Sequence, residues 1–212
     1  MITTLDKHTA LVVIDLQDGI VKMSTAHPGT VIVQQSARLV EAFRKAGLPV
    51  VIVNVIPFGA ASGKVRTQAP GMPKDEAAEA GRAPKTEGRQ QSSGARAAME
   101  AAGFFTIVPE LGSRPEDIYV TKKTWNAFYD TDLEQRLKEL DVTNIVLCGI
   151  ATSIGVEGTA RAAYERGFNV SFVEDAMTDI VLSAHENSLQ TIFPRLGEVD
   201  TTDAVLELLE KR

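Results

Sequence analysis

The sequence predicts an α/β protein built on a mainly parallel sheet, with about six strand and helix units. Short apolar runs alternate with amphipathic stretches along most of the 212 residues, which is the pattern of strands followed by crossover helices. The apolar runs are continuous and do not alternate with polar residues, as expected for strands that are buried on both faces.

The first two expected strands are separated by one helix. Residues 10–16 form the first apolar run, and residues 49–56 form the second. Between them, apolar side chains recur at helical spacing around Leu39 and Phe43, and Gly47 follows where that helix is expected to end.

The second half of the chain continues the alternation. Thr131 to Glu134 and Ser183 to Glu186 have the form of capping boxes and predict where two helices begin. The other expected elements are a helix over 95–102, strands over 118–121, 144–150, 170–173 and 198–200, a helix that ends at Gly167, and a helix from Thr202.

The segment 57–94 interrupts this pattern. It is dominated by Gly, Ala, Ser, Pro, Lys, Arg and Gln and shows neither the helical nor the strand period. Since so long an irregular segment in a compact domain is usually functional or mobile, we interpret it as a flap beside the active-site end. A linker between two domains is the alternative, but neither flank is complete as a separate sheet, so we expect a single domain over 1–212.

Composition excludes several classes of function. The 22 Lys and Arg and 28 Asp and Glu give a net charge of −6, which argues against a nucleic-acid partner. No apolar run approaches the roughly 18 residues that span a bilayer, and the first residues do not resemble a secretion signal. We therefore expect a cytoplasmic protein without a membrane partner. Cys148 is the only cysteine, so the chain forms no internal disulfide and no cysteine cluster for a metal.

Three features fall at the carboxyl ends of expected strands, where an open parallel sheet binds its ligands. Asp15 ends the first strand, Lys122 and Lys123 end another, and residues 149–155 turn a third strand into a helix. Each has an ordinary explanation as a cap, a solvated edge or a turn. The turn does not match the dinucleotide fingerprint, because Ala151 stands where a glycine is needed.

Four blocks of sequence together resemble the isochorismatase-like hydrolase family. They are residues 9–17 (TALVVIDLQ), Lys122 with residues 125–133 (WNAFYDTDL), residues 146–161 and residues 173–176. The resemblance covers nearly the whole chain apart from 57–94. It implies a three-layer α-β-α sandwich with a mainly parallel, Rossmann-like sheet. It also implies a homo-oligomer, a dimer or tetramer, in which neighbouring subunits shape the pocket.

The resemblance also assigns active-site positions. Asp15 matches the acid of the family, and Lys122 matches its lysine because it stands four residues before Asn126. Ile150 and Ala151 match the position of a non-proline cis peptide whose nearby amides help to form an oxyanion site.

The nucleophile position is where the chain departs from the family pattern. Amide-cleaving members carry a cysteine where this sequence has Gly155, and Cys148 lies seven residues earlier inside an expected buried strand. A glycine has no side chain that can attack a carbonyl group, so acid–base chemistry replaces nucleophilic chemistry as the leading hypothesis.

The substrate is expected to be a small carboxylated molecule. Phe58, Trp125 and Phe128 are interpreted as an apolar wall for a small ring, with packing in the core or an interface as the alternative. Residues 54–58 lack the Asp and His by which nicotinamidase members hold a metal, so no metal and no other cofactor is expected. The expected substrate-binding residues are Gln17, Phe58, Trp125, Phe128, Ile150, Ala151 and Ser153.

The leading hypothesis is hydrolysis of a vinyl ether with Asp15 as the general acid. This role needs a raised pKa, which burial would produce and Lys122 would oppose. One alternative is a catalytically inactive member that binds a small molecule or regulates. The other is a water-mediated amide or ester hydrolase with Asp15 as the base.

Overall fold

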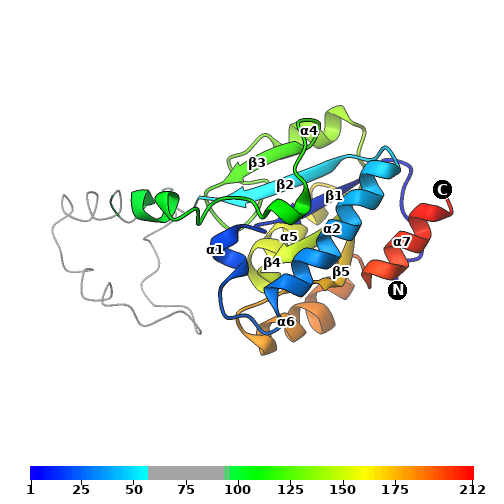
Figure 1. Ribbon diagram of the computed structural model, residues 1–212. Coiled ribbons are helices and arrows are strands. Elements are labelled where there is room, and N and C mark those ends of the chain that lie inside the picture. The colour runs from blue at the N-terminus through cyan, green and yellow to red at the C-terminus, as the bar shows by residue number, and fades with distance from the viewer. Residues whose placement is uncertain (57–93, 95) are drawn as a thin grey trace.

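Six parallel strands form one sheet in the computed structural model, which describes residues 1–56, 94 and 96–212 (Figure 1). The strand order is β3-β2-β1-β4-β5-β6, and every pairing is parallel. The strands are β1 (Thr9–Ile14), β2 (Val50–Val55), β3 (Ile118–Lys122), β4 (Asn144–Ile150), β5 (Asn169–Thr178) and β6 (Glu198–Asp200). The expected strands are thus confirmed, with β5 extending further than its apolar run indicates.

The helices lie between and after these strands. They are α1 (Asp18–Val21), α2 (Gly29–Lys45), α4 (Leu133–Glu139), α5 (Glu157–Glu165), α6 (Leu182–Asn187) and α7 (Thr202–Glu210). Residues 96–101 are also helical. Short 3-10 turns cover Pro109–Leu111 and Phe193–Arg195, and π-helical turns cover Thr152–Val156 and Ser188–Ile192. Most of the segment 57–94 that we interpret as a flap lies outside the described residues.

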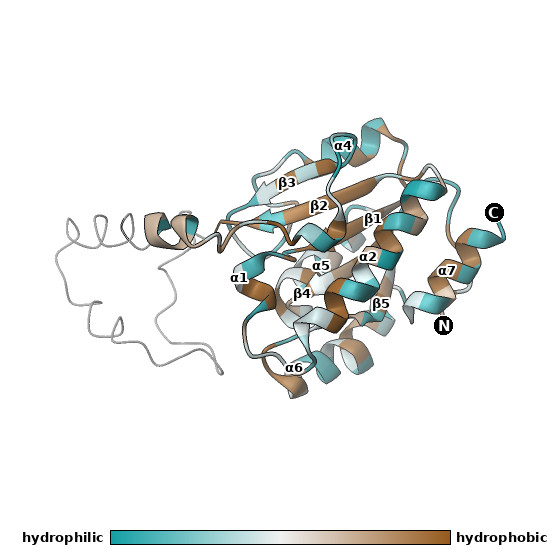
Figure 2. Ribbon diagram, viewed as in Figure 1, coloured by the Kyte–Doolittle hydropathy of each residue, from teal (hydrophilic) through white to brown (hydrophobic). Residues whose placement is uncertain are grey.

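Two apolar cores lie on opposite faces of the sheet, as the continuous apolar runs predict. Along β1, Val12 and Ile14 pack into the core under α4 and α5, whereas Leu11 and Val13 pack into the core under α2 and α7. Figure 2 shows the strands largely hydrophobic between helices that carry hydrophilic residues. The three-layer α-β-α fold is therefore confirmed.

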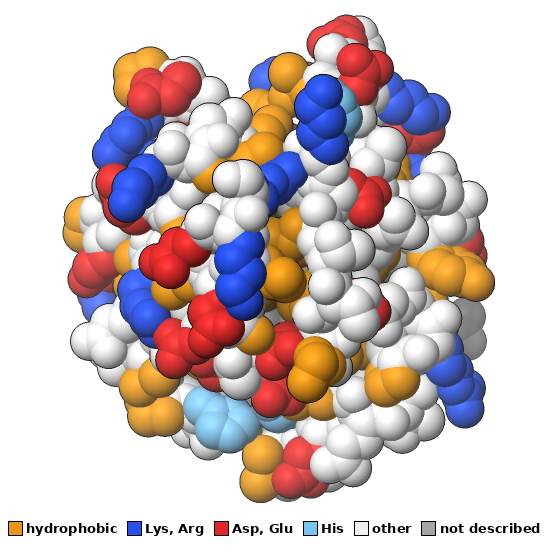
Figure 3. All heavy atoms as spheres, turned by 90° about the vertical axis from the view of Figure 1, so that its right-hand side faces the viewer, with side chains coloured by type: hydrophobic (Ala, Val, Ile, Leu, Met, Phe, Trp, Pro, Cys, Tyr) orange, Lys and Arg blue, Asp and Glu red, His pale blue; other side chains and the backbone are white. Residues whose placement is uncertain are grey.

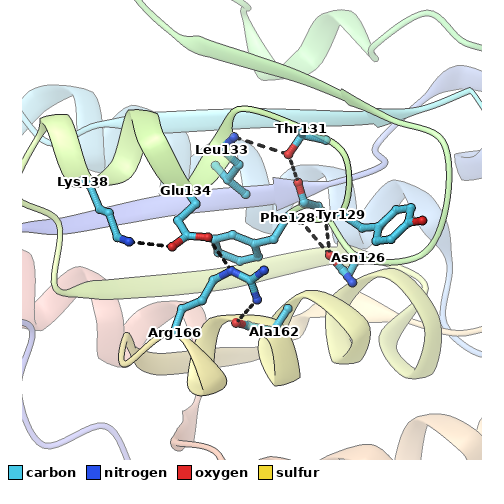
Figure 4. A network of polar contacts seen from close by, with 10 residues as sticks. Asn126, Phe128, Tyr129, Thr131, Leu133, Glu134, Lys138, Ala162 and Arg166 are labelled. Atoms are coloured by element: carbon cyan, nitrogen blue, oxygen red, sulfur yellow. Dashed lines mark hydrogen bonds and ion pairs between the residues drawn. The ribbon is translucent and has the colours of Figure 1, made fainter.

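The helix start predicted at residues 131–134 is confirmed, but the capping box itself does not form. Helix α4 begins at Leu133, and its first turn receives no side-chain cap from the residue before it. The Thr131 hydroxyl accepts only a long bond from the Leu133 amide, at 3.4 Å. Glu134 does not turn back towards the helix start, because its carboxylate pairs with Lys138 at 2.6 Å and with Arg166 at 2.7 Å (Figure 4).

The prediction of a second capping box at Ser183 is also wrong. Helix α6 begins one residue earlier, at Leu182, and the preceding Val181 offers no side-chain cap. Ser183 therefore lies inside the first turn. At both helix starts the described partners of the first amides are nearby groups of the chain, among them the Thr131 hydroxyl for Leu133 and the Val181 carbonyl oxygen for Ala184.

The order of the strands reverses between β1 and β4, and this point determines where ligands bind in such a sheet. Gly149 makes the close approach of these two strands possible. Its φ is +119°, and a β-carbon built on it would lie 2.0 Å from the Ile14 carbonyl oxygen. A side chain at this position would force the two strand ends apart.

The end of the sheet at which the strands begin lies away from this switch point and faces the viewer in Figure 3. Acidic and basic side chains are interspersed on this face, with apolar side chains between them. The two chain ends also meet here, since the Ile2 amide donates to Asp200 and Arg212 donates to the backbone of Asp6. None of the helices among the described residues has the length and apolar character that a membrane crossing needs.

Candidate active site

Asp15 and Lys122 form a buried ion pair at the carboxyl ends of β1 and β3. The Lys122 ammonium nitrogen lies 2.5 Å from Oδ2 of Asp15 and also donates to the Thr124 carbonyl oxygen at 3.1 Å. The two side chains are only 2% and 6% exposed, for lysine and aspartate respectively. The topology creates this pair, because β2 separates the two strands by a single step and all of them run in the same direction.

The backbone at Asp15 turns the chain away from the sheet. Its φ is +52°, in the left-handed region that Asp tolerates better than most residues, and the Gln17 amide donates to the Asp15 carbonyl oxygen at 2.8 Å. The carboxylate therefore stands just beyond the end of β1, at the point where the strand order reverses.

The Asp15 carboxylate is incompletely satisfied. Oδ2 accepts from Lys122, whereas Oδ1 is the one buried side-chain oxygen or nitrogen among the described residues that has no hydrogen-bond partner. Burial raises the pKa of Asp15 from its ordinary 3.8 to about 6, although the charge and the hydrogen bond of Lys122 act in the opposite direction. A group with this pKa can both give and take a proton near neutral pH.

The turn after β4 forms the other side of the site. The peptide bond between Ile150 and Ala151 is cis, as the resemblance implies. Gly155 lies in the following π-helical turn, and a β-carbon built on it would be 3.3 Å from Oδ2 of Asp15 and 2.8 Å from Cγ2 of Ile14. The structure thus brings the positions of Asp15, Lys122 and Gly155 together.

Cys148 does not take part in this cluster. It is fully buried in β4 and belongs to the apolar core under α2 and α7, on the other face of the sheet from Ile14 and α5. The Ser36 hydroxyl from α2 lies 3.6 Å from its sulfur, and burial raises the pKa of the thiol to about 12. Such a thiol is a packing group and does not form a thiolate near neutral pH.

Gln17 lies beside the site with its side-chain amide already engaged. It accepts from the Val55 amide at 2.7 Å and donates to the Val55 carbonyl oxygen at 3.2 Å. The side chain is buried and closes the end of β2 against the chain that follows β1. Its polar groups therefore hold the rim of the sheet, which leaves a substrate-binding role for Gln17 as a prediction.

The aromatic residues of the expected apolar wall are separated. Trp125 is 63% exposed, whereas Phe128 is buried with its ring 5.9 Å from that of Phe168 and under the guanidinium of Arg166 (Figure 4). Phe128 thus packs in the core beneath α4 and α5, which is the alternative named above. Phe58 lies outside the described residues.

Two polar residues that no sequence pattern marks, Asp179 and His185, hold the turn after β4. Asp179 accepts hydrogen bonds from the Ser153 amide and hydroxyl, at 2.7 and 2.8 Å. Nδ1 of His185 shares a hydrogen bond of 2.8 Å with the Thr152 hydroxyl. A single Asp after a strand and a single His on a helix carry no periodic signal, so only the tertiary structure reveals these contacts.

Among the described residues no group of three or more His, Cys, Asp and Glu side chains is arranged to hold a metal ion. The polar groups that the described residues bring together at this site are the Asp15 carboxylate and the Lys122 ammonium, next to the turn of residues 150–155.

Comparison with known proteins relates this arrangement to a family. Residues 9–204 match the isochorismatase domain family. The chain is 39% identical over 200 residues to the uncharacterized isochorismatase family protein YwoC of Bacillus subtilis, covering 94% of this chain and 93% of that protein. It is 26% identical over 210 residues to the ureidoacrylate amidohydrolase RutB of Variovorax paradoxus, covering 91% of this chain and 79% of that protein. The structure of an isochorismatase family protein from Burkholderia thailandensis matches with a TM-score of 0.79 and 39% identity, covering 99% of this chain and 100% of that one.

Proposed function

Because the chain belongs to the isochorismatase family, we propose that it hydrolyses a small carboxylated substrate by acid–base chemistry, without a cysteine nucleophile. The observation that carries this proposal is the buried pair of Asp15 and Lys122, with one carboxylate oxygen unpartnered and the side-chain-free Gly155 against it. The reaction that fits best is hydrolysis of a vinyl ether.

The proposal of a mechanism without a nucleophile follows from the two positions where a thiol would matter. Gly155 faces the carboxylate but has no side chain, and the only thiol of the chain, Cys148, lies in the core on the other face of the sheet. Covalent catalysis through cysteine needs a thiolate within reach of the reacting carbon. Neither residue meets this condition.

Asp15 is suited to the role of general acid. Its Oδ2 is held by Lys122, so a proton on the carboxyl group resides on Oδ1, the oxygen without a partner. With a pKa of about 6, about a tenth of the molecules carry this proton at pH 7. Oδ1 then transfers it to the methylene carbon of an enolpyruvyl ether, and an oxocarbenium ion forms.

Water completes the reaction. It adds to the oxocarbenium carbon and gives up a proton to the Asp15 carboxylate, which restores the acid. The resulting hemiketal collapses to pyruvate and an alcohol, so that one water is consumed for each ether bond broken. The carboxylate thus returns to its starting state after each turnover.

Lys122 is proposed to bind the carboxylate of the substrate. An ammonium carries three N–H donors, and the described residues take two of them, through Asp15 and the Thr124 carbonyl oxygen. The third is available to a carboxylate. A bound substrate anion would also offset the positive charge that otherwise favours ionised Asp15.

A second candidate function is water-mediated hydrolysis of an amide or ester with Asp15 as the base. The similarity to the amidohydrolase RutB favours it, as does the contact with Lys122, which stabilises the ionised carboxylate. An inactive binding or regulatory member is a weaker candidate, because both the carboxylate and the lysine are present and paired.

A panel of vinyl ethers, small amides and esters tests the proposal. The protein is expected to release pyruvate from an enolpyruvyl ether of a ring carboxylate, and Asp15→Asn is expected to lower the rate at least about 100-fold. The matched control is Asp18→Asn, which breaks an exposed Asp–Lys pair of 2.6 Å on α1 and should leave the rate unchanged. Turnover of amides alone, or undiminished turnover by Asp15→Asn, would overturn the proposal.

A further inference from the structure

A second buried carboxylate, that of Asp179, accepts hydrogen bonds from the turn that lies next to Asp15. Asp179 follows β5 directly and is 2% exposed. Its Oδ2 accepts from both the amide and the hydroxyl of Ser153, while its Oδ1 accepts from the Val181 amide at 3.2 Å. The carbonyl oxygen of Asp179 accepts from the Ala26 amide at 2.8 Å. One residue thus ties the turn after β4 to two other segments.

The neighbouring residue of the turn has an anchor of its own. The Thr152 hydroxyl bonds to Nδ1 of the buried His185 on α6. The ring of His185 lies 4.9 Å from that of His27, whose backbone amide donates to the Thr178 hydroxyl at 3.0 Å. Two consecutive residues of the turn are therefore held from the same side.

The turn in turn covers the Asp15 carboxylate. Gly155 comes two residues after Ser153 and lies so close to Asp15 that even a β-carbon would touch Oδ2. Among the described residues no hydrogen bond joins Gly155 to the carboxylate, so the distance between them depends on what holds the turn. Asp179 supplies two of these bonds through one oxygen.

We propose that Asp179 is a positioning residue of the active site, which fixes the turn of residues 151–156 against the Asp15 carboxylate and thereby limits the access of bulk water to it. The proposal rests on the proposed function in that Asp15 is the reacting acid. A turn that drifts by about 1 Å would misplace the substrate against this acid and admit water.

Asp179 is expected to influence Asp15 by holding the turn in place and not by its own negative charge. The pKa of Asp15 is raised by its burial and lowered by Lys122, and Asp179 does not contribute to this shift. When the turn loosens, water reaches Asp15, and its pKa falls towards the ordinary value. This change reports on the position of the turn and needs no substrate.

The experiment measures the titration of the Asp15 carboxyl carbon by NMR together with kcat and KM, in Asp179→Asn and Ser153→Ala. Asp179→Asn is expected to lower the pKa of Asp15 and to reduce kcat about 10- to 100-fold, with a smaller change in KM. Ser153→Ala carries no change of charge and keeps the backbone bond, so it should shift both quantities in the same direction by less. Ser153→Thr keeps the hydroxyl and should leave the titration of Asp15 as in the wild type.

The control is Asp117→Asn. Asp117 is also a buried carboxylate that accepts a hydrogen bond from a backbone amide, that of Arg114 at 2.8 Å. It pairs with Arg44, however, and lies before the first residue of β3, at the end of the sheet away from the site. This variant is expected to lower Tm and leave the titration of Asp15 as in the wild type. Should Asp179→Asn fail to fold, the pair Ser153→Ala and Ser153→Thr carries the test.

The outcomes separate the two proposals. An Asp15 titration that is the same in wild type, Asp179→Asn and Ser153→Ala would overturn the positioning role, whatever the activity. An equal shift in Asp117→Asn would overturn it as well, because the effect would then be one of general stability. If the wild type hydrolyses no vinyl ether while the titration shifts as expected, the proposed function fails and the positioning of the turn stands.

Discussion

Gly155 lies against Asp15 so closely that a β-carbon on the glycine would stand 3.3 Å from Oδ2 of the carboxylate. Any side chain at this position would therefore project beside the acid. The sequence resemblance puts the cysteine of amide-cleaving members here, and the geometry shows that a thiol at residue 155 would start next to the ion pair. On the proposed function, this glycine is the feature that separates acid–base chemistry from nucleophilic chemistry.

Gly155→Cys is expected to introduce cleavage of small amides, whereas Gly155→Ala, which adds the same β-carbon without the thiol, should not. Both variants crowd Ile14, whose Cγ2 would lie 2.8 Å from the new carbon, so each should lower the free energy of unfolding by about 1–3 kcal/mol. Amide hydrolysis and urea denaturation measure the two effects. Amide cleavage by the wild type at the rate of Gly155→Cys would contradict the expectation that a thiol at residue 155 is needed.

The rate of vinyl ether hydrolysis is expected to fall as the pH rises above about 6, because Asp15 must be protonated to act and its pKa is raised to about 6 by burial. The slope of kcat/KM should approach a tenfold loss for each pH unit. A rate that rises over the same range would show that Asp15 works as a base.

Lys122→Met is expected to move the alkaline limb of this profile to higher pH. Both the charge and the hydrogen bond of Lys122 lower the pKa of Asp15, so their removal lets burial raise it further. KM for a carboxylated substrate should rise as well. The control is Lys123→Met, since Lys123 is exposed and pairs only loosely with Asp130 at 3.4 Å; a similar shift in this control would argue against a specific role of Lys122.

The stability of the wild type relative to Asp15→Asn is expected to fall as the pH rises from about 4 to about 6. In this window the folded protein holds the Asp15 proton more tightly than the unfolded chain, whose carboxyl has the ordinary pKa, so deprotonation costs stability. The interval from 3.8 to about 6 corresponds to about 3 kcal/mol in wild type, and the asparagine variant lacks this dependence. Urea denaturation of both proteins between pH 4 and 7 gives the difference, which should be flat if Asp15 is not buried as described.

Cys148→Ala is expected to leave every hydrolytic rate unchanged, because the thiol packs under α2 and its pKa is raised to about 12. In the native wild type the thiol should react with iodoacetamide only as fast as the protein unfolds. Rapid modification accompanied by loss of activity would show that Cys148 is accessible and acts as a nucleophile.

The sequence predicts the sheet well because the strands are buried on both faces. Residues such as Leu11 and Val12, which face opposite cores, leave a continuous apolar run that needs no knowledge of the fold to detect. The parallel arrangement then explains why Asp15 and Lys122 meet, since both stand at the carboxyl ends of their strands and all strands run in the same direction.

Single polar residues are where the sequence is a poor guide. Thr131 and Ser183 have the pattern of helix caps, and the helices do begin near them, but neither makes the reciprocal capping contacts that the pattern predicts. Asp179 and His185 show no pattern and yet hold the turn of the site. Their roles depend on contacts between segments that are distant in the chain, which local spacing does not encode.

Asp15 and Lys122 are 107 positions apart in the chain, and Gly155 comes later still. Each stands at or beyond the end of a different strand of one sheet, so no local hairpin or helix pair contains the complete centre. The acid acquires its unusual proton affinity only after β1, β3 and the turn beyond β4 have all docked. On the proposed mechanism a partly folded chain would be catalytically silent, and turnover would report that assembly of the sheet is complete.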